Sequence, residues 1–225
     1  MRAMILAAGR GERMGELTLT TPKPLLRVGN HFLIEYAIHN CKRAGIYDVV
    51  INVSYGAEKI KNALGDGKQY GINIQYSEEV ERLEVGGGIF NALSHLGQDP
   101  FIVISADVIT DYPLKQLKLK PIHLAHLILV DNQHYHPEGD FGLRDGLIDF
   151  NSQTKLTFAN VGIYHPKIFA NCQPGYFSWR TVMQPVIDNQ QVTGEYFSGN
   201  WHNVGTPQDL SRANEDANLR TLVEM

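Results

Sequence analysis

Short apolar runs alternate with amphipathic stretches through the first half of the chain. Ala3–Ala8 and Phe101–Ser105 have the length and the continuous apolar character of buried strands. Leu33–Ala44 carries apolar residues at helical spacing, and Gly45 follows where a helix C-terminus favours glycine. The other elements predicted here are strands at Val49–Val53 and Ile72–Tyr76, a helix at Ala57–Leu64, and a loop running into a helix over Glu84–Leu96. Because strands and helices alternate with short links, the pattern predicts parallel β-α-β units.

The second half of the pattern is richer in strands. Arg144-Asp145-Gly146 predicts a hairpin, because Asp-Gly is a preferred pair of turn residues. Helices are predicted at Phe177–Ile187 and Pro207–Leu222, and strands at His123–Val130, Phe141–Leu143, Leu147–Phe150, Leu156–Tyr164, Val192–Phe197 and Trp201–Asn203. No linker rich in Ser, Pro or Gly separates the halves, so we expect one α/β domain over residues 1–225.

The strand predicted at Ala3–Ala8 leads into a loop with two glycines and two arginines, Gly9–Arg13. Glycine lets the backbone approach a ligand closely and point N–H groups at phosphate oxygens, and arginine adds a forked set of donors. Ten residues later comes Lys23, between Pro22 and Pro24, which restrict the backbone on both sides. The strand, the loop and the lysine together predict a site for a polyphosphate.

Two common phosphate-binding sequence patterns do not match this chain. The dinucleotide pattern G-x-G-x-x-G needs a third glycine where the chain has Met14, which weakens a dehydrogenase interpretation. The Walker A pattern needs Ser or Thr after Gly-Lys, but Gly67-Lys68 is followed by Gln69.

The stretch instead resembles the signature of sugar-1-phosphate nucleotidylyltransferases, L-A-A-G-x-G-x-R-[ML] followed by P-K-P-L. Leu6–Met14 and Pro22–Leu25 carry both blocks, and the resemblance extends from Met4 to about Leu210. It implies a Rossmann-like open mixed sheet of the nucleotide-diphospho-sugar transferase type. A nucleotide-binding half would cover about residues 1–110, and a sugar-phosphate-binding half about residues 111–225. The implied reaction is Mg²⁺-dependent transfer of a nucleotidyl group from a nucleoside triphosphate to a sugar 1-phosphate, with release of pyrophosphate.

The resemblance assigns Mg²⁺, which prefers oxygen ligands, to the ends of two strands. Asp107 lies in Ser105–Val108, which resembles the family's G-D block with alanine in place of glycine. Trp201–Thr206 resembles W-x-D-V-G-T, but Asn203 stands where the family has its second metal carboxylate. Three explanations stay open: one carboxylate suffices, another group such as Asp111 joins the site, or catalysis is impaired.

In members of this family, a segment after the third strand recognises the nucleotide base. Leu83–Gly88 stands at that place in this chain. Its three successive glycines allow close approach to a flat ring, although a flexible hinge would show the same pattern. The form L-E-x-G-G-G most resembles uridylyltransferases that act on N-acetylmuramate 1-phosphate in bacterial cell-wall recycling. Guanylyltransferases for mannose 1-phosphate share the remaining blocks and are the alternative. UTP is therefore the favoured nucleotide, assigned to Leu6, Ala7, Ala8, Gly9, Gly11, Arg13, Glu84, Gly86 and Gly87.

The sugar phosphate is assigned to residues of both halves. Asn160–Tyr164 resembles the family's N-x-G-I-Y, whose asparagine faces the sugar. Asp140 and Gly142 could bring backbone to a sugar hydroxyl, although each block alone has an ordinary strand or turn explanation. We expect Lys23 to bridge the two reacting phosphates and Arg13 to stabilise the leaving pyrophosphate. A sugar-nucleotide-binding module without catalysis is a further alternative.

Composition narrows the remaining classes. A net charge of −4 argues against a general nucleic-acid binder, and no apolar run reaches the ~18 residues of a membrane span. Two distant cysteines and an N-terminus without a signal-peptide pattern predict a cytoplasmic protein. The sequence does not determine the oligomeric state.

Overall fold

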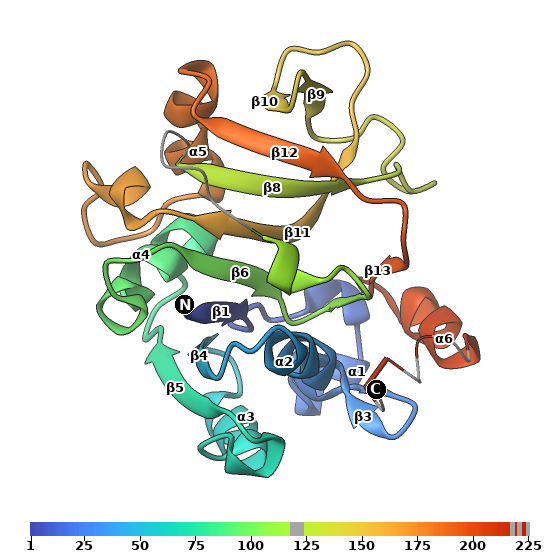
Figure 1. Ribbon diagram of the computed structural model, residues 1–225. Coiled ribbons are helices and arrows are strands. Elements are labelled where there is room, and N and C mark those ends of the chain that lie inside the picture. The colour runs from blue at the N-terminus through green and yellow to red at the C-terminus, as the bar shows by residue number, and fades with distance from the viewer. Residues whose placement is uncertain (118–123, 217–218, 220–221, 224–225) are drawn as a thin grey trace.

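The fold is built on one large mixed sheet. The computed structural model describes residues 1–117, 124–216, 219 and 222–223. Nine strands form the sheet in the order β5-β4-β1-β6-β11-β8-β12-β10-β9, which runs through both halves of the chain (Figure 1). The first half contributes four parallel strands, as the apolar runs predicted: β1 (Ala3–Leu6), β4 (Asp48–Val53), β5 (Asn73–Glu78) and β6 (Phe101–Ser105).

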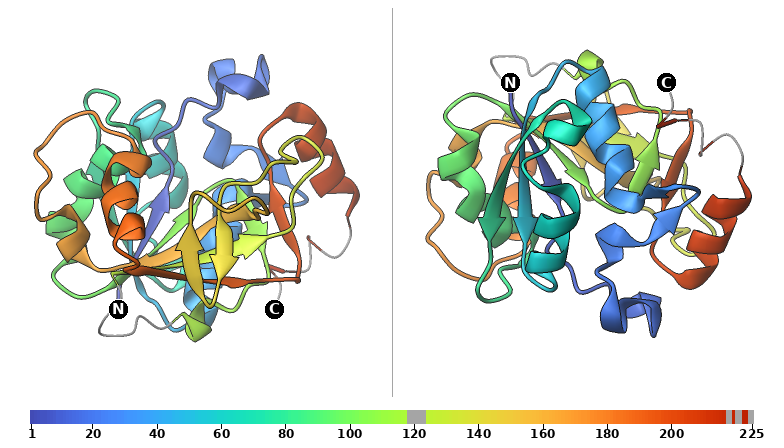
Figure 2. Two further views of the ribbon diagram at one scale, coloured as in Figure 1. Left: turned by 90° about the horizontal axis from the view of Figure 1, so that it is seen from above. Right: turned by 90° about the horizontal axis from the view of Figure 1, so that it is seen from below.

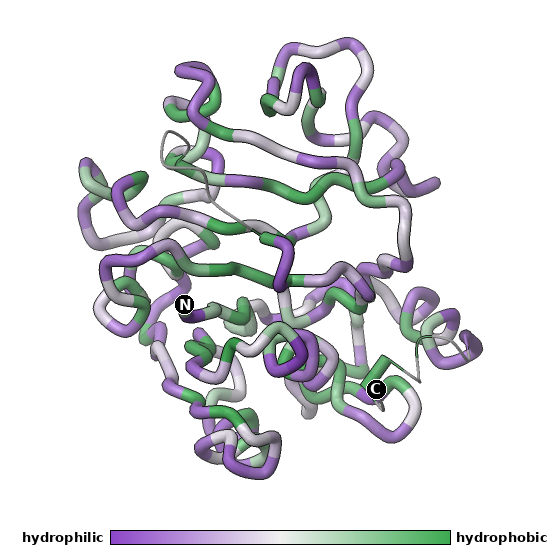
Figure 3. Tube along the Cα trace, viewed as in Figure 1, coloured by the Kyte–Doolittle hydropathy of each residue, from purple (hydrophilic) through white to green (hydrophobic). Residues whose placement is uncertain are grey.

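Helices cover both faces of these parallel strands (Figure 2). Alternate residues of β1 point to opposite faces, so Ile5 packs with the helices α2 (Leu33–Arg43) and α3 (Ala57–Leu64). Met4 packs on the other face with α4 (Glu84–Leu96). Figure 3 shows the hydrophobic colour running along β6, whose residues are buried except at the end of the strand.

The second half extends the sheet with both strand directions. β11 (Thr157–Tyr164) pairs antiparallel with β6 and with β8 (Ala125–Val130). β12 (Val192–Tyr196) pairs parallel with β8, and α5 (Trp179–Asp188) packs against α4. The predicted hairpin is β9 (Gly142–Arg144) and β10 (Leu147–Asp149), with positive φ at both turn residues between them.

Several short elements were absent from the sequence prediction. β7 (Val108–Thr110) is one of them, and it pairs with the predicted strand β13 (Trp201–Asn203) in a separate two-stranded sheet. β2 (Arg27–Val28) and β3 (His31–Phe32) also pair with each other. A short helix α1 (Leu17–Thr20) follows the predicted phosphate-binding loop Gly9–Arg13, named the phosphate loop. Runs of two to four residues show no measurable period, so these elements arise from tertiary contacts.

Some boundaries differ from the sequence prediction. The segment Glu84–Leu96 is helical from its first residue, and α6 (Pro207–Glu215) ends seven positions before the predicted Leu222. The predicted start of a strand at His123 lies outside the described residues. Among the helices of the described ranges, none has the length and hydropathy that a membrane crossing requires.

Candidate active site

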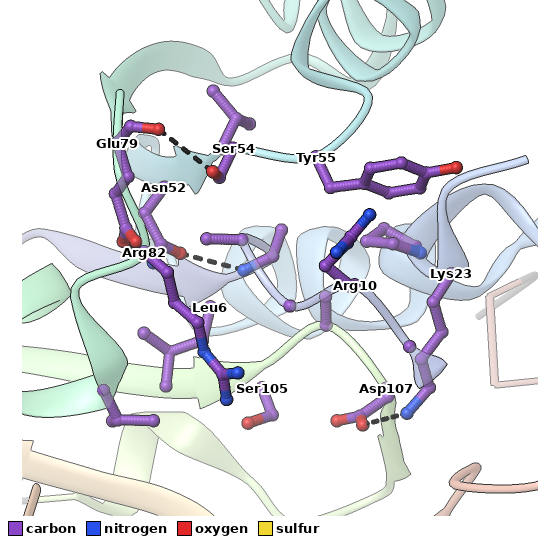
Figure 4. Close-up of a pocket in the computed structure, with 18 of the residues that line it drawn as sticks. Leu6, Arg10, Lys23, Asn52, Ser54, Tyr55, Glu79, Arg82, Ser105 and Asp107 are labelled. Carbon is purple, nitrogen blue, oxygen red and sulfur yellow. Dashed lines mark hydrogen bonds and ion pairs between the residues drawn. The ribbon is translucent and has the colours of Figure 1, made fainter. Parts of the chain in front are cut away.

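A cavity of about 820 Å³ opens at the carboxyl ends of β1 and β6 (Figure 4). Its lining includes the phosphate loop, Lys23 and Asp107, together with Glu84 and Val85 at the start of α4. Ligands of open α/β sheets bind at this edge of the parallel strands. The predicted phosphate-binding residues, Asp107 and the start of α4 therefore line a single cavity.

The phosphate loop is shaped by contacts with Lys23. Gly11 has a φ of +67°, and a Cβ there would lie 2.9 Å from the Lys23 Cβ, so only glycine fits without a shift. Thr18 donates its hydroxyl to the Gly11 carbonyl at 3.0 Å. At Gly9, in contrast, a Cβ would have no neighbour within 4 Å among the residues that the structure describes, beyond its own chain neighbours, because this residue faces the cavity.

Lys23 and Asp107 form an ion pair between Nζ and Oδ2, although they are 84 positions apart (Figure 4). Lys23 begins a short 3₁₀-helix (Lys23–Leu25) and is only 9% exposed. The guanidinium of Arg13 lies against Gly205, where a Cβ would be 3.4 Å from both terminal nitrogens. The cations of Lys23 and Arg13 and the carboxylate of Asp107 thus meet at one end of the cavity, which is named the phosphate end after its predicted ligand.

Asn203 lies beside Asp107, because the Val204 N–H donates to the Asp107 carbonyl at 2.9 Å and β13 pairs with β7. Asn203 Oδ1 is buried and has no hydrogen-bond partner within the described part of the chain. An orphaned buried carbonyl costs free energy unless a ligand satisfies it. Asp111, the possible substitute carboxylate, instead accepts the N–H and the side-chain amide of Asn200 at 2.9 and 2.7 Å.

The oxygen donors of Asp107 and Asn203 fit a hard cation that takes its other ligands from phosphate and water. In the described ranges, no cluster of three or more His, Cys, Asp or Glu side chains has the geometry of a metal site. A metal at this position would therefore depend on its substrate for part of its coordination.

Tyr135, in the loop between β8 and β9, was missed by sequence reasoning. Burial raises the pKa of its hydroxyl, and so do the charges of Asp209 and Asp107, while Arg13 and a hydrogen bond with Asn203 lower it. The loop therefore brings a phenol from the second half of the chain to the phosphate end of the cavity. No periodicity or motif in the sequence marks this residue.

The other end of the cavity is held by a series of buried hydrogen bonds, named the buried relay, which the sequence did not reveal. The Ala7 N–H donates to Asn52 Oδ1 at 2.8 Å (Figure 4). Asn52 Nδ2 in turn donates to Glu79 Oε1 at 2.7 Å. Glu79 Oε2 accepts the Leu83 N–H at 3.4 Å. Burial raises the pKa of the Glu79 carboxyl, and the two hydrogen bonds lower it. The relay links the ends of β1, β4 and β5 to the start of α4.

The three glycines of α4 pack against protein. A Cβ at Gly86 or Gly87 would lie 2.4 or 2.3 Å from carbonyl oxygens of the segment 175–178, and one at Gly88 would lie 2.5 Å from Glu79 Oε1. The Gly87 N–H donates to the Phe177 carbonyl at 3.0 Å. Close helix packing thus explains the triplet, and the role of Gly86 and Gly87 in nucleotide binding remains a sequence prediction.

A smaller side chamber of about 180 Å³ adjoins the main cavity and shares Leu6, Val85 and Ser105 with it. Asn160, at a φ of +54°, lines this chamber. Its other lining residues are Ile89, Val103, Phe158, Tyr164 and Trp179, so its wall is mainly apolar and aromatic.

Asp140 and Gly142 lie outside the lining of both cavities. Asp140 accepts the Phe158 N–H at 2.8 Å and lies 3.1 Å from His136 Nε2, and a Cβ at Gly142 would clash with Ser152 at 2.1 Å. The structure therefore brings together Leu6, Ala7, Ala8, Gly9, Gly11, Arg13, Lys23, Glu84 and Asp107 in one cavity, with Asn203 beside it and Asn160 in the adjoining chamber.

The family model described as nucleotidyl transferase matches residues 2–219. The chain belongs to this family. It is 43% identical to the N-acetylmuramate alpha-1-phosphate uridylyltransferase of Neisseria meningitidis over 95% of this chain and 96% of that protein. It is 32% identical to the mannose-1-phosphate guanyltransferase of Schizosaccharomyces pombe over 93% of this chain, and it spans 62% of that longer protein.

Solved structures confirm the fold of this nucleotidyl transferase. The inositol-1-phosphate CTP transferase from T. maritima superposes with a TM-score of 0.81 at 20% identity, covering 99% of this chain and 94% of that one. A UDP-glucose pyrophosphorylase complexed with UDP-glucose gives a TM-score of 0.78 at 19% identity, covering 95% and 97%. The predictions of a sugar-1-phosphate nucleotidylyltransferase, of an enzyme and of an open mixed sheet are confirmed.

Proposed function

We propose that this enzyme transfers a uridylyl group from UTP to N-acetylmuramate 1-phosphate, with Mg²⁺, giving UDP-N-acetylmuramate and pyrophosphate. The observation that carries this proposal is the 43% identity to the uridylyltransferase of Neisseria meningitidis, which extends over nearly the whole of both chains. A place in cell-wall recycling in the cytoplasm follows from the same proposal.

The proposed reaction needs charge and position more than proton transfer. An oxygen of the sugar phosphate attacks the α-phosphorus of UTP and forms a new P–O bond. The bond from the α-phosphorus to the bridging oxygen breaks, and its electron pair leaves with pyrophosphate. Because the attacking oxygen is already an anion, no side chain has to remove a proton. The protein must hold two anions together and stabilise the departing charge.

The cations at the phosphate end have these tasks. Arg13, with the backbone of Gly9 and Gly11, binds the triphosphate and stabilises the leaving pyrophosphate. Lys23 lies between the α-phosphate and the attacking phosphate, once the substrates draw it from its ion pair with Asp107. Support for these roles is the convergence of the loop and the lysine on one cavity.

Asp107 and Asn203 would hold Mg²⁺ through a carboxylate and an amide oxygen. Asn203 Oδ1 is buried and has no hydrogen-bond partner among the described residues, which supports this assignment, because a bound cation would satisfy it. When bound, the ion supplies positive charge that offsets the charge of the phosphates. Asn203 contributes no charge, so this site binds Mg²⁺ more weakly than two carboxylates would.

A guanylyltransferase for mannose 1-phosphate is the second candidate, since relatives of that activity match 93% of this chain at 32% identity. A pyrophosphate-release assay with Mg²⁺ separates the candidates, using UTP, GTP, CTP, ATP and dTTP against the 1-phosphates of N-acetylmuramate, N-acetylglucosamine, glucose and mannose. We expect the highest kcat/KM with UTP and N-acetylmuramate 1-phosphate. A higher value with GTP and mannose 1-phosphate, or no turnover with UTP, would overturn the proposal.

A further inference from the structure

Arg82 stands where the main cavity meets the side chamber. It lines the main cavity together with Leu6 and Ser105, which also line the side chamber. Figure 4 shows its guanidinium group turned toward Ser105. The side chain is 70% exposed, and Nη2 donates to Glu84 Oε1 at 3.0 Å. A guanidinium carries five N–H donors, so most of them remain for a ligand in the cavity.

The contact that holds Arg82 is itself fixed by the fold. The Glu84 carboxylate also accepts the Tyr176 hydroxyl at 3.0 Å, and the Glu84 backbone has a φ of +61°. Non-glycine residues adopt this left-handed conformation only where their surroundings impose it, often at ligand sites. Glu84 therefore ties the segment before α4 to the segment after β11 and presents Arg82 to the cavity.

The side chamber beside Arg82 suits a small apolar group. Phe158 and Trp179 stack at a ring-centroid distance of 5.4 Å, and Trp179 donates its Nε1–H to the Tyr164 hydroxyl at 3.2 Å. The volume of about 180 Å³ exceeds the roughly 10–15 Å³ that one water needs, so several non-hydrogen atoms fit. Asn160, assigned to the acceptor sugar, lines the same chamber. The acceptor sugar would thus lie next to both an apolar chamber and the guanidinium of Arg82, which has donors besides the one bonded to Glu84.

The substituents of N-acetylmuramate match this pair of features. The sugar has a methyl-bearing acetamido group and an ether-linked lactate whose carboxylate is negative at neutral pH. Guanidinium binds carboxylate through two parallel N–H···O hydrogen bonds, which also impose orientation. A purely structural ion pair with Glu84 is a weaker explanation, because exposed pairs of this kind contribute little to stability.

We propose that Arg82 selects sugar 1-phosphates that carry a carboxylate, by binding that carboxylate at the junction of the two cavities. This inference rests on the proposed function, and it assigns the choice between an acidic and a neutral amino sugar to one side chain.

Two substrates that differ only in the lactyl group test the proposal. With UTP and Mg²⁺, kcat/KM is measured for N-acetylmuramate 1-phosphate and N-acetylglucosamine 1-phosphate in the wild type and in Arg82→Gln. We expect the variant to lose roughly 10- to 100-fold with the acidic sugar, mainly through a higher KM, as for a charge-assisted hydrogen bond. The loss with the neutral sugar should be at least tenfold smaller. Arg82→Lys keeps the charge and should recover part of the preference.

Arg180→Gln is the matched control, because Arg180 is exposed, donates to Gln184 at 3.1 Å and lines neither cavity. It should leave both values within about twofold of the wild type, as for other surface changes. Equal losses with both sugars in Arg82→Gln, or no loss with either, would overturn the role of Arg82. A wild type that fails to use UTP with N-acetylmuramate 1-phosphate would instead overturn the proposed function.

Discussion

The glycines and the charged side chains at the two ends of the cavity have opposite surroundings. At the phosphate end, Gly9 leaves open space, and the charges of Lys23 and Asp107 form an ion pair at the cavity wall. At the end next to α4, Gly87 lies so close to a neighbouring carbonyl that a Cβ would meet it at 2.3 Å. Glu79 there is buried and bonded to the uncharged side chain of Asn52.

This difference separates residues that act on the ligand from residues that shape the space for it. Substitutions at the phosphate end should change the rate with every substrate and leave the fold intact. Substitutions at the α4 end should first change stability, because the affected atoms touch protein. Variants of each kind can break or sharpen this distinction.

Lys23→Ala should have the largest effect. We expect kcat/KM to fall by about 10²- to 10³-fold, by the same factor for every sugar phosphate, because a preorganised charge is lost from the reacting phosphates. Lys68→Ala removes an exposed lysine paired with Asp66 and should leave the rate unchanged. A Lys23→Ala rate within about threefold of the wild type would show that the assigned role is wrong.

Gly87→Ala and Gly9→Ala test the two glycine environments directly. We expect Gly87→Ala to lower the free energy of unfolding by about 1–3 kcal/mol, because the added methyl overlaps the Gly175 carbonyl. In a chain of this size, each kcal/mol lowers Tm by roughly 2–4 °C. Gly9→Ala should keep Tm but raise the KM for UTP, since its methyl enters the space of the ligand. The comparison fails if Gly9→Ala is the less stable variant in thermal unfolding.

Asn203→Asp should strengthen the metal site by roughly tenfold or less, because a carboxylate replaces a neutral carbonyl beside Asp107. The readout is the Mg²⁺ concentration that gives half-maximal pyrophosphate release, which should fall. Asn151→Asp adds the same charge on an exposed turn and should not shift this concentration. An unchanged or higher Mg²⁺ requirement in Asn203→Asp would exclude Asn203 as a ligand.

Glu79→Gln should change the pH dependence of stability by a smaller amount. Because burial raises the Glu79 pKa above 4.5, the folded protein binds more protons than the unfolded chain just above that pH. This carboxyl therefore makes stability fall as pH rises from 4.5 to the raised pKa, by less than about 1.4 kcal/mol per pH unit.

Urea unfolding of Glu79→Gln between pH 4.5 and 7 should show a flatter profile than the wild type, because the amide does not titrate. Glu138→Gln, at an exposed loop position, serves as the control and should keep the wild-type slope. A wild-type slope in Glu79→Gln would show that burial does not raise the pKa of the Glu79 carboxyl.

Continuous or periodic patterns in the sequence were sufficient for the long elements. β6 and α3 have the predicted bounds, because a buried strand and an amphipathic helix are each determined by their own side chains. The strand β13 was predicted, but β7 and its pairing with β13 were missed, because β7 has only three residues and the two strands are far apart in the chain. It is this pairing that carries Asn203 to Asp107.

By itself, the sequence determined the family, the parallel half of the sheet and the phosphate loop with its lysine, because these depend on local patterns and on motifs at fixed spacing. The tertiary structure alone decided that Lys23 meets Asp107, that the α4 glycines face protein, and that Arg82 lines the cavity. It also decided that Tyr135 lies near Asn203. Such contacts depend on where distant segments cross, and neither spacing nor periodicity along one chain contains that information.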